Sequence, residues 1–513
     1  MMLRMTIAIW LFLAGGLLNA RALDPADFTF RYKVSFERYD RETVLTHFPV
    51  LLQFDRTRTL LYGGMASPVG GDLRFTDAGG TAELNYEIDT WCPDGLSAVW
   101  VQVPTLSSNA CIYVYWGNRS DTNVPAYATD GSTWSNAYVA VHHLSASSGS
   151  NATDATSNGL DGVLRNMSDE AWRSGILGNG LRFDGEEDYY EMPDIRPYFE
   201  GDAATLNVWV KLDAATPTGV NRSGFMSLGS GSNSHYPWLN GWAYLNVWRS
   251  SRVDNIVLHP GVDRTQWHMV TITSENVLTD GWRMYQNGEE VHRWFGGSLN
   301  MSSVPMIGRQ NSYWFDGMFD ELRLSDEVRS PDWIWASWIN TASNEVFLTS
   351  GPVDVLPTNL PVVVSLFSTE RSPTGAVIRG QLASTGSAST AVSVVYGAED
   401  EGIGNPSDWP SMHHFGVSLS NAPVEYAFNL NGLSPNTVRC YRYYATNAFG
   451  SWWGEPRCFS TLGPPIVDNG SGASAVGVGQ ATLNGAFLSA QRGDSHFTHG
   501  IAETTDVGGW IRK

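Results

Sequence analysis

The chain has 513 residues, 32 of them basic and 52 acidic, which gives a net charge of −20 at pH 7. A surface this negative repels phosphate backbones and anionic bilayers, so nucleic acids and lipid surfaces are excluded as expected partners. At ~100–200 residues per domain, the length predicts three or four domains. The 52 glycines, 21 tryptophans and 20 tyrosines favour strands and turns over long helices.

The N-terminus has the pattern of an export signal. Arg4 supplies a positive charge, residues 7–18 are apolar, and Ala20 and Ala22 flank Arg21 as a small-x-small cleavage site. The apolar stretch is too short to span a bilayer, and no stop-transfer segment follows it. We therefore predict that residues 1–22 are removed and that the protein is secreted or displayed at the cell surface. The alternative is an uncleaved membrane anchor.

Four cysteines form two local pairs, Cys92 with Cys111 and Cys440 with Cys458. An exported protein meets oxidising conditions, so we predict two disulfide bonds. The strands on either side of Phe449 are typical of a hairpin, and Cys440 and Cys458 are equidistant from that residue, so they should lie opposite one another. The alternative is buried free thiols. Neither pair has the CxxC spacing or the nearby histidine of a zinc site.

Residues 23–130 contain short apolar or alternating segments between Gly, Asp and Ser turns, a pattern that predicts a β-sandwich. Five motifs follow one another there, at residues 48–52, 71–77, 84–88, 99–104 and 113–118. Their order resembles a bacterial surface module, the domain of unknown function 2341. The resemblance implies an extracellular β domain, usually placed before a lectin-like one, with no known chemistry.

Residues 131–350 continue the strand pattern, with spacings typical of a two-sheet jelly roll. Asn287-Gly288 is the signal of a type I′ hairpin. The main motifs lie at residues 139–144, 175–185, 205–211, 267–272 and 315–324. Their order is similar to the concanavalin A-like, laminin-G-like jelly-roll family. The resemblance implies an extracellular all-β domain that binds glycans or proteins, and many members of the family hold calcium.

One helix is predicted, over residues 332–339. Ser330 is a favourable N-cap and Pro331 suits the first helical position. Trp335 and Trp338 are three residues apart on one face, and we expect them to pack on the jelly roll rather than to form a ligand platform.

The C-terminal part begins with a predicted linker, residues 351–359, which are rich in Pro and Gly. Residues 360–463 alternate as strands, and residues 433–450 resemble the end of a fibronectin type III module, with Arg439 where that family places a tyrosine. Residues 464–513 repeat the start of this segment and stop early, so we expect an incomplete second repeat in a fragment of a longer protein. The predicted fold class is all-β: tandem sandwiches with a central concanavalin A-like jelly roll and Ig- or fibronectin III-like C-terminal modules.

The strongest catalytic signal is the E-x-D-x-x-E spacing of Glu186, Asp188 and Glu191, which matches jelly-roll glucanases and would place two carboxylates across a glycosidic bond. An acidic turn after a glycine is the simpler interpretation. His142 and His143 lie on an apolar strand, so one of the pair should point inward, and a satisfied core histidine is the expected role. We therefore predict that the protein is not an enzyme.

A calcium site is predicted in the jelly roll. Asp154, Asn158 and Asp161 share one Gly-rich loop and offer the hard oxygens that Ca²⁺ prefers. The family resemblance implies a further ligand from the closing strand, Asp320 or Glu321. The alternative is a loop whose carboxylates only cap backbone N–H groups.

A sugar platform is predicted at Tyr236, Trp238, Asn240 and Trp242, aromatic and amide side chains in a Gly/Pro-broken stretch. The alternative is inward packing in a sheet. The expected function is attachment to an extracellular glycan or surface protein through the jelly roll. The alternatives are a structural spacer in a surface stalk, and a glycoside hydrolase that uses Glu186 and Glu191.

Overall fold

The computed structural model describes residues 21–489 with short gaps. These gaps are residues 200, 214–221, 224–225, 230–235, 241–243, 249–252, 258–262, 264, 276–280, 295–300, 311–312, 419–422, 464–465, 469–472, 478–479 and 484–485. The predicted signal peptide lies outside the described residues except for Arg21 and Ala22. The fold is all-β, with several sandwich sheets and a concanavalin-like jelly roll, as the sequence predicted.

The first domain is a sandwich of two antiparallel sheets, with strand orders β26-β1-β6-β3 and β2-β5-β4. Its core lies between them, because alternate residues of each strand face inward. Val34, Val99 and Val114 are fully buried there. The elements are β1 (Phe30–Ser35), β2 (Leu45–Asp55), α1 (Thr59–Gly64), β3 (Arg74–Thr76), β4 (Tyr86–Thr90), β5 (Leu96–Leu106) and β6 (Cys111–Trp116).

A strand that follows the jelly roll in the sequence completes the first domain. Strand β26 (Thr349–Val355) pairs with β1, so the prediction of a linker over residues 351–359 is wrong for its first five residues. A sequence rich in Pro and Gly can still form an edge strand, where an N–H need not be donated. The predicted boundary near residue 350 therefore falls inside a strand of the first domain.

The predicted helix is confirmed as α2 (Pro331–Ala342), with the Ser330 hydroxyl accepting from the Trp333 amide; α3 (Asn344–Phe347) follows it. It packs on the first domain, and not only on the jelly roll as expected. The Trp333 ring contacts the edge of Phe48, and the Asn340 side chain accepts from Leu51 N and donates to Pro49 O of β2. No helix among the described residues is long and apolar enough to cross a membrane.

The jelly roll is built on an eight-stranded sheet, with strand order β10-β11-β25-β13-β19-β20-β21 and β7 paired to β25. A five-stranded sheet, β15-β22-β12-β9-β8, and a four-stranded sheet, β14-β16-β17-β18, complete it. The Asn287-Gly288 hairpin is confirmed, because both residues have positive φ between β20 and β21. The strands are β7 (Tyr138–His142), β8 (Asn151–Ala152), β9 (Gly162–Arg165), β10 (Trp172–Ser174), β11 (Asn179–Asp184), β12 (Tyr189–Glu191), β13 (Ala204–Leu212), β14 (Arg222–Ser223), β15 (Met226–Gly229), β16 (Tyr236–Asn240), β17 (Tyr244–Trp248), β18 (Val253–Val257), β19 (His268–Ser274), β20 (Trp282–Gln286), β21 (Glu289–Trp294), β22 (Met301–Ile307), β23 (Arg309–Gln310), β24 (Tyr313–Trp314) and β25 (Asp316–Ser325).

The C-terminal sandwich has a three-stranded sheet, β27-β28-β31, facing a five-stranded sheet, β30-β29-β32-β33 with β34 paired to β32. Two short hairpin-like pairs, β35 with β38 and β36 with β37, follow it. The strands are β27 (Val362–Thr369), β28 (Gly375–Ser384), β29 (Thr390–Gly397), β30 (Ser411–Ser418), β31 (Val424–Asn431), β32 (Val438–Asn447), β33 (Gly450–Trp453), β34 (Arg457–Ser460), β35 (Ile466–Asp468), β36 (Ala473–Gly477), β37 (Gln480–Leu483) and β38 (Ala486–Ser489). Six short 3-10 helices complete the described elements: η1 (Pro25–Asp27), η2 (Ala126–Ala128), η3 (Ser132–Trp134), η4 (Asp169–Ala171), η5 (Arg196–Tyr198) and η6 (Pro406–Asp408).

One of the two predicted disulfides is present. Cys440 and Cys458 are directly opposite in the β32–β34 ladder and are bonded. Cys92 and Cys111 are free, which contradicts the prediction. Cys111 begins β6 in one sheet of the sandwich, whereas Cys92 follows β4 in the other sheet. Closeness in sequence therefore does not bring these two thiols together.

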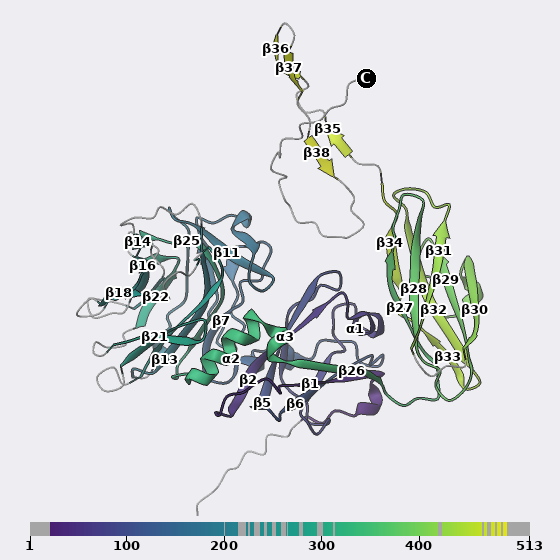
Figure 1. The fold of residues 1–513 in the computed structure, drawn as a ribbon, viewed down its shortest axis with the longest axis horizontal. Helices are drawn as coiled ribbons and strands as arrows, with labels where there is room; N and C mark the ends of the chain where they lie inside the picture. Colours follow the sequence, from purple (N-terminus) through teal and green to yellow (C-terminus); the bar gives the residue numbers. More distant parts are fainter. Residues whose placement is uncertain are drawn as a thin grey trace, which may run out of the picture.

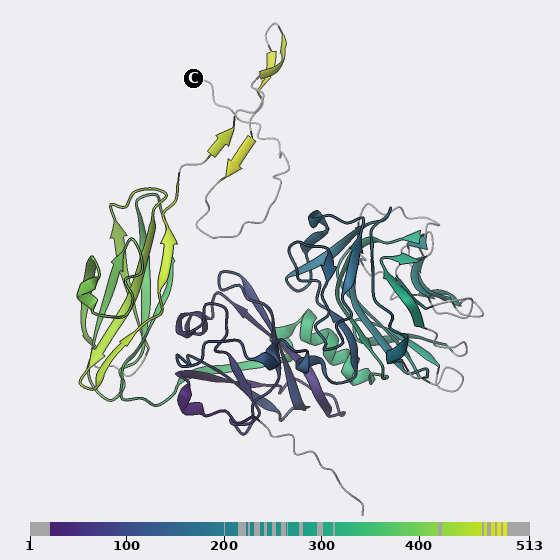
Figure 2. The ribbon, with the colours of Figure 1, turned by 180° about the vertical axis from the view of Figure 1, so that it is seen from behind.

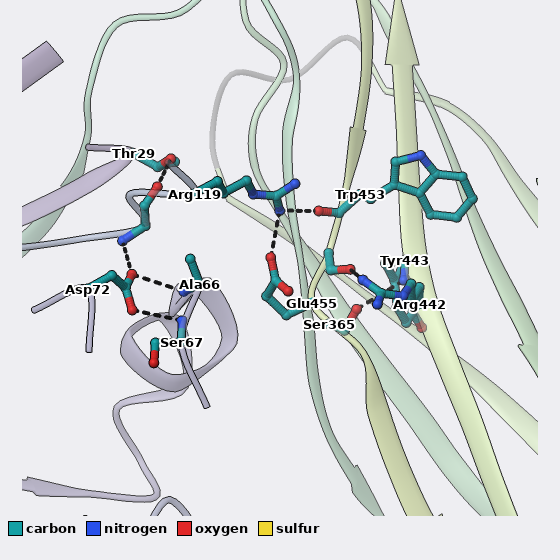
Figure 3. A network of polar contacts seen from close by, with 12 residues as sticks. Thr29, Ala66, Ser67, Asp72, Arg119, Ser365, Arg442, Tyr443, Trp453 and Glu455 are labelled. Atoms are coloured by element: carbon teal, nitrogen blue, oxygen red, sulfur yellow. Dashed lines mark hydrogen bonds and ion pairs between the residues drawn. The ribbon is translucent and has the colours of Figure 1, made fainter. Parts of the chain in front are cut away.

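The first domain lies between the jelly roll and the C-terminal sandwich (Figures 1 and 2). Helix α1 packs against β27, and Val364 and Leu366 of β27 belong to the same buried cluster as Leu61. Polar contacts flank this apolar join (Figure 3): the Arg119 guanidinium lies 3.0 Å from the Glu455 carboxylate and also donates to a main-chain carbonyl of β33. The first domain and the C-terminal sandwich are therefore joined by a common apolar core and not by a flexible hinge.

The Asp72 carboxylate organises the first-domain side of this join. It accepts hydrogen bonds from the amides of Ala66 (3.0 Å), Ser67 (2.8 Å) and Gly117 (2.8 Å), as Figure 3 shows. Burial nevertheless raises the pKa of Asp72, because the desolvation of the charge outweighs these donors.

Candidate functional site

A cavity of about 460 Å³ lies where the first domain meets the jelly roll. Its walls come from β4, from the segment around η2 and η3, from the residues after β7 and from the loop between β8 and β9. Glu87, Asp89, Thr133, His143 and Trp172 line it. The cavity therefore combines carboxylates, a hydroxyl, an imidazole and an aromatic ring from two domains.

Glu87 and Asp89 lie two apart on β4, so both side chains project from the same face of the strand. Glu87 Oε2 accepts a hydrogen bond from the indole of Trp134. Asp89 Oδ2 is buried and has no hydrogen-bond partner. Burial raises the pKa of Asp89 to about 6, although His143 acts in the opposite direction.

His143 follows the last residue of β7 and is 6% exposed. Its Nδ1 lies 2.9 Å from Glu321 Oε1, and its ring stacks on Trp100 at 5.8 Å. Its Nε2 is buried without a hydrogen-bond partner, and Glu87 Oε2 lies 3.6 Å from it, beyond hydrogen-bond range. Burial lowers the pKa of His143, but the carboxylates of Glu321 and Asp89 outweigh burial and hold the pKa well above its ordinary value.

A β-bulge in β25 supplies Glu321. The pairing of β25 with β13 shifts register at this point, and Glu321 has φ of 50°, in the left-handed region. Asp320 and Glu321 are consecutive, yet both are buried, at 0% and 1% exposure. Glu321 Oε2 accepts from Arg323 at 2.6 Å. An unusual backbone thus directs a carboxylate at His143, as strained residues at functional sites often do.

The predicted calcium loop is compact and internally hydrogen-bonded. Asp154 Oδ1 accepts from the amides of Val141 (2.9 Å) and Thr156 (3.0 Å). Asp161 Oδ1 accepts from the Asp154 amide at 2.8 Å, and the Asn158 side chain donates to the backbone. The loop therefore has the capping contacts of the alternative interpretation, and calcium binding stays a prediction.

Asp320 is not joined to that loop. Its Oδ2 accepts from the amides of Ile176 (2.8 Å) and Leu177 (3.1 Å), and burial holds its pKa well above the ordinary value. Among the described His, Cys, Asp and Glu residues, the group whose ligand atoms come within 4.8 Å of one another is Asp89, His143 and Glu321. Glu321, the alternative calcium ligand, is thus grouped with Asp89 and His143, which line the cavity.

The predicted sugar platform lies at the edge of what the structure describes. The backbone of Tyr236, Trp238 and Asn240 forms β16, which pairs with β17. Their side chains, and Trp242 altogether, lie outside the described residues. Sugar contact at this stretch stays a prediction.

The carboxylates of the glucanase-like motif are apart from the cavity. Glu186 is exposed, and its amide donates to Asp184 Oδ1 at 2.8 Å. Glu191 lies on β12, where Arg165 forms an ion pair with it at 2.7 Å. Asp188 lies between Glu186 and Glu191 in the sequence. Burial raises the pKa of Asp188 to about 6, and the negative charge of Asp184 raises it further.

Both histidines of the pair are buried, whereas the sequence predicted one inward histidine, and His142 is the one bonded as a core residue. Its ring nitrogens contact Tyr190 Oη at 3.1 Å and the Leu160 carbonyl at 3.0 Å. Alternation along a strand turns His143 to the other face, which the first domain covers. The sequence signal was the adjacency of the two histidines, because neighbouring side chains of an extended segment point to opposite sides.

Two family models match parts of the chain. Residues 184–335 match the concanavalin A-like lectin/glucanases superfamily, and residues 69–154 match the domain of unknown function 2341. Both resemblances inferred from the sequence are therefore confirmed for these segments. The lining residues Glu87, Asp89 and His143 lie in the second of these segments, and Glu321, which contacts His143, lies in the first. No curated protein matches the chain.

Several solved structures are similar at low identity. Domain 4 of AbnA, an extracellular arabinanase from Geobacillus stearothermophilus in complex with arabinotriose, is 18% identical with a TM-score of 0.31, and the match covers 39% of this chain and 96% of that one. The Trypanosoma rangeli sialidase in complex with the inhibitor DANA is 12% identical over 47% of this chain and 42% of that one, with a TM-score of 0.31. The botulinum neurotoxin serotype D ligand-binding domain in complex with N-acetylneuraminic acid is 8% identical over 60% and 70%, with a TM-score of 0.32.

Proposed function

We propose that this protein is a secreted or cell-surface binding protein that recognises a glycan and does not catalyse a reaction on it. The cavity of about 460 Å³ between the first two domains carries the proposal. Cavities of ~300–1,000 Å³ are of the size that buries small ligands. The match to a superfamily described by its lectins and glucanases supports the same class of ligand.

The lining of the cavity suits a polyhydroxylated ligand. Glu87 and Asp89 offer carboxylate acceptors, and the buried Thr133 hydroxyl has no hydrogen-bond partner. Trp172 adds an apolar ring. A sugar pairs its hydroxyls with such groups and places its C–H face on an aromatic ring, so it can satisfy polar atoms that would otherwise remain buried and unpaired.

Absence of catalysis is part of the proposal. Glu186 and Glu191, the pair that a glucanase mechanism would use, do not line the cavity. Arg165 neutralises Glu191 through an ion pair, which is not the environment of a general acid. Reducing-sugar release measured for the parent chain and for Glu191→Gln tests this part: release that the substitution abolishes would establish a hydrolase.

A glycan array probed with the secreted chain tests the main proposal. Thr153 lies on the exposed rim of the cavity, so Thr153→Trp should fill the entrance and abolish binding to the glycans detected. Ser148 is exposed and does not line the cavity, so Ser148→Trp should leave binding unchanged. Glycan binding that survives Thr153→Trp would assign recognition to another surface, such as the stretch around β16.

A structural spacer is the second candidate, and the join between the first domain and the C-terminal sandwich favours it. Leu61 and Val364 share one buried cluster across that join, and Arg119 is paired with Glu455. A rigid join of this kind holds domains at a fixed distance. An array without any bound glycan would favour this candidate.

A further inference from the structure

Three buried polar atoms at the cavity have no hydrogen-bond partner: the Thr133 hydroxyl and two atoms of titratable groups, Nε2 of His143 and Oδ2 of Asp89. His143 is 6% exposed, so its ring is more than nine-tenths buried. An unsatisfied buried polar group costs about 1–3 kcal/mol, and native folds contain few of them. Two such atoms beside one cavity indicate that a partner normally lies between them.

The other side of the His143 ring is already fixed. Nδ1 lies 2.9 Å from Glu321 Oε1, so with that nitrogen donating, the lone pair of Nε2 points away from Glu321. A histidine that binds a metal through one ring nitrogen usually donates a hydrogen bond from the other nitrogen to a carboxylate. This contact fixes the tautomer and the ring orientation. The β-bulge that places Glu321 against His143 would therefore fix the orientation of a metal-binding imidazole.

Carboxylates from both domains lie close to His143. The ligand atoms of Asp89, His143 and Glu321 lie within 4.8 Å of one another. Glu87 Oε2 is 3.6 Å from His143 Nε2, too long for a hydrogen bond. Atoms that bind one ion at about 2.0–2.2 Å lie roughly 3–3.5 Å apart, so the carboxylates of Asp89 and Glu87 would have to turn toward His143 Nε2 when the ion binds.

We propose that His143 Nε2 and the carboxylates of Asp89 and Glu87 bind a divalent transition-metal ion of the zinc class at the wall of the cavity, with Glu321 orienting His143. An imidazole nitrogen with carboxylate oxygens suits zinc, whereas calcium and magnesium prefer oxygen alone. The cavity leaves room for water or a ligand oxygen in the remaining coordination positions.

The local charges agree with a cation. Arg323 Nη2 lies 2.6 Å from Glu321 Oε2 and so neutralises Glu321. Among the described contacts at the cavity, His143 is then the one positively charged partner of both Glu87 and Asp89. A dication in place of a proton on Nε2 would balance both carboxylates. Because Asp89 and Glu87 belong to the first domain and His143 is held by Glu321 of the jelly roll, the ion would join the two domains.

The proposed ligands differ from those of the predicted calcium loop, which forms another wall of the same cavity, and the proposal does not rest on glycan recognition. The test uses the full secreted chain, stripped with chelator and titrated with zinc chloride by isothermal calorimetry in the absence of any sugar. We expect one equivalent of zinc bound, with calcium and magnesium unable to displace it. Cobalt added instead of zinc should give visible absorption bands that report a nitrogen- and oxygen-bound ion.

Two substitutions locate the ion. Asp89→Asn should weaken zinc binding at least about tenfold, because even the partners that support metal ligands change affinity 10–100-fold. Glu42→Gln removes an exposed carboxylate elsewhere in the first domain and should change nothing. If Asp89→Asn proves unstable, Glu87→Gln gives the same measurement, since the Glu87 side chain is 22% exposed and tolerates change.

The proposal is overturned by a chain that binds no zinc in a saturable manner, or by zinc binding that both Asp89→Asn and Glu87→Gln leave unchanged. The second result would place the metal elsewhere, for example at His413 and His414. Zinc binding without glycan binding would leave this inference standing and remove the proposed function. Glycan binding without zinc binding would do the reverse.

Discussion

Nδ1 of His143 lies 2.9 Å from Oε1 of Glu321, although 178 residues of chain separate them. The histidine directly follows one strand of the large jelly-roll sheet, and the carboxylate comes from a bulge in the neighbouring strand. The first domain closes over both residues, through the ring of Trp100 and the carboxylate of Glu87. The polar cluster therefore exists only where the two domains meet.

The single disulfide should stabilise the C-terminal sandwich. Cys440 and Cys458 are 18 residues apart, and closing a loop of about this length contributes roughly 3 kcal/mol in the chain-entropy model. Replacing both by serine should lower the free energy of unfolding by about that amount in a thermal or denaturant melt. The double replacement of Cys92 and Cys111 is the matched control. An equal loss in the control would show that this pair is bonded too.

The first domain should not fold from its first segment alone. A chain of residues 23–130 lacks β26, which pairs with β1, and α2, whose Asn340 satisfies the backbone of β2. It should be unfolded by circular dichroism, because an edge and a buried backbone would remain unpaired. A chain of residues 23–355 contains both of these partners and should unfold cooperatively. A folded 23–130 fragment would contradict the discontinuous domain.

Asp188 should limit stability at neutral pH. Burial raises its pKa to about 6 in the folded chain, against about 3.9 for a free aspartate. The neutral form is favoured by the fold, so stability is lost as pH rises from about 4 to 6 and the loss is constant above that range. Asp188→Asn should therefore raise the melting temperature at pH 7.5 and leave it unchanged below pH 4. Because the group is only partly buried and solvent screens its charge, the gain should be below about 1 kcal/mol.

Glu187→Gln is the matched control for the pH experiment, since Glu187 is the exposed neighbour of Asp188. Melting temperatures should be measured from pH 3.5 to 8. The melting temperature of Asp188→Asn should exceed that of the parent chain only above pH 5. A gain for Asp188→Asn of the same size at every pH would show that the effect is not one of ionisation.

Arg119 and Glu455 should couple the first domain to the C-terminal sandwich. Their ion pair, at 3.0 Å, is partly buried, with side chains 37% and 23% exposed. A double-mutant cycle with alanine should give a coupling of about 0.5–3 kcal/mol. The exposed pair Arg31 and Asp354 is the comparison and should give about 0.2–1 kcal/mol. A larger coupling for the exposed pair would argue against a rigid join.

Calcium should raise the melting temperature if the loop of Asp154, Asn158 and Asp161 binds it. Binding to the folded state alone adds about 2.7 kcal/mol at a hundredfold excess over Kd. Asp161→Ala should abolish the difference between calcium and chelator. Identical melting curves in calcium and in chelator would leave the loop as a set of backbone caps, which is what the contacts of Asp154 already provide.

The sequence alone determined the local structure and the class of fold. Alternation and turn residues predicted the sandwiches, Asn287-Gly288 predicted its hairpin, and Ser330 with Pro331 predicted the start of α2. Symmetry about Phe449 placed Cys440 opposite Cys458. These features depend on residues close in the chain, whose geometry follows from backbone preferences and the period of the strand.

Only the tertiary structure decided how distant segments meet. Pairing of β26 with β1 depends on a strand about 320 residues away, and no local pattern distinguishes such a strand from a linker. The partner of His143 depends on the bulge at Glu321 and on the domain that covers both. The contact between the two domains buries the unpaired atoms of Asp89 and His143, and no local motif encodes that burial. The sequence therefore predicted one core histidine and not the cluster.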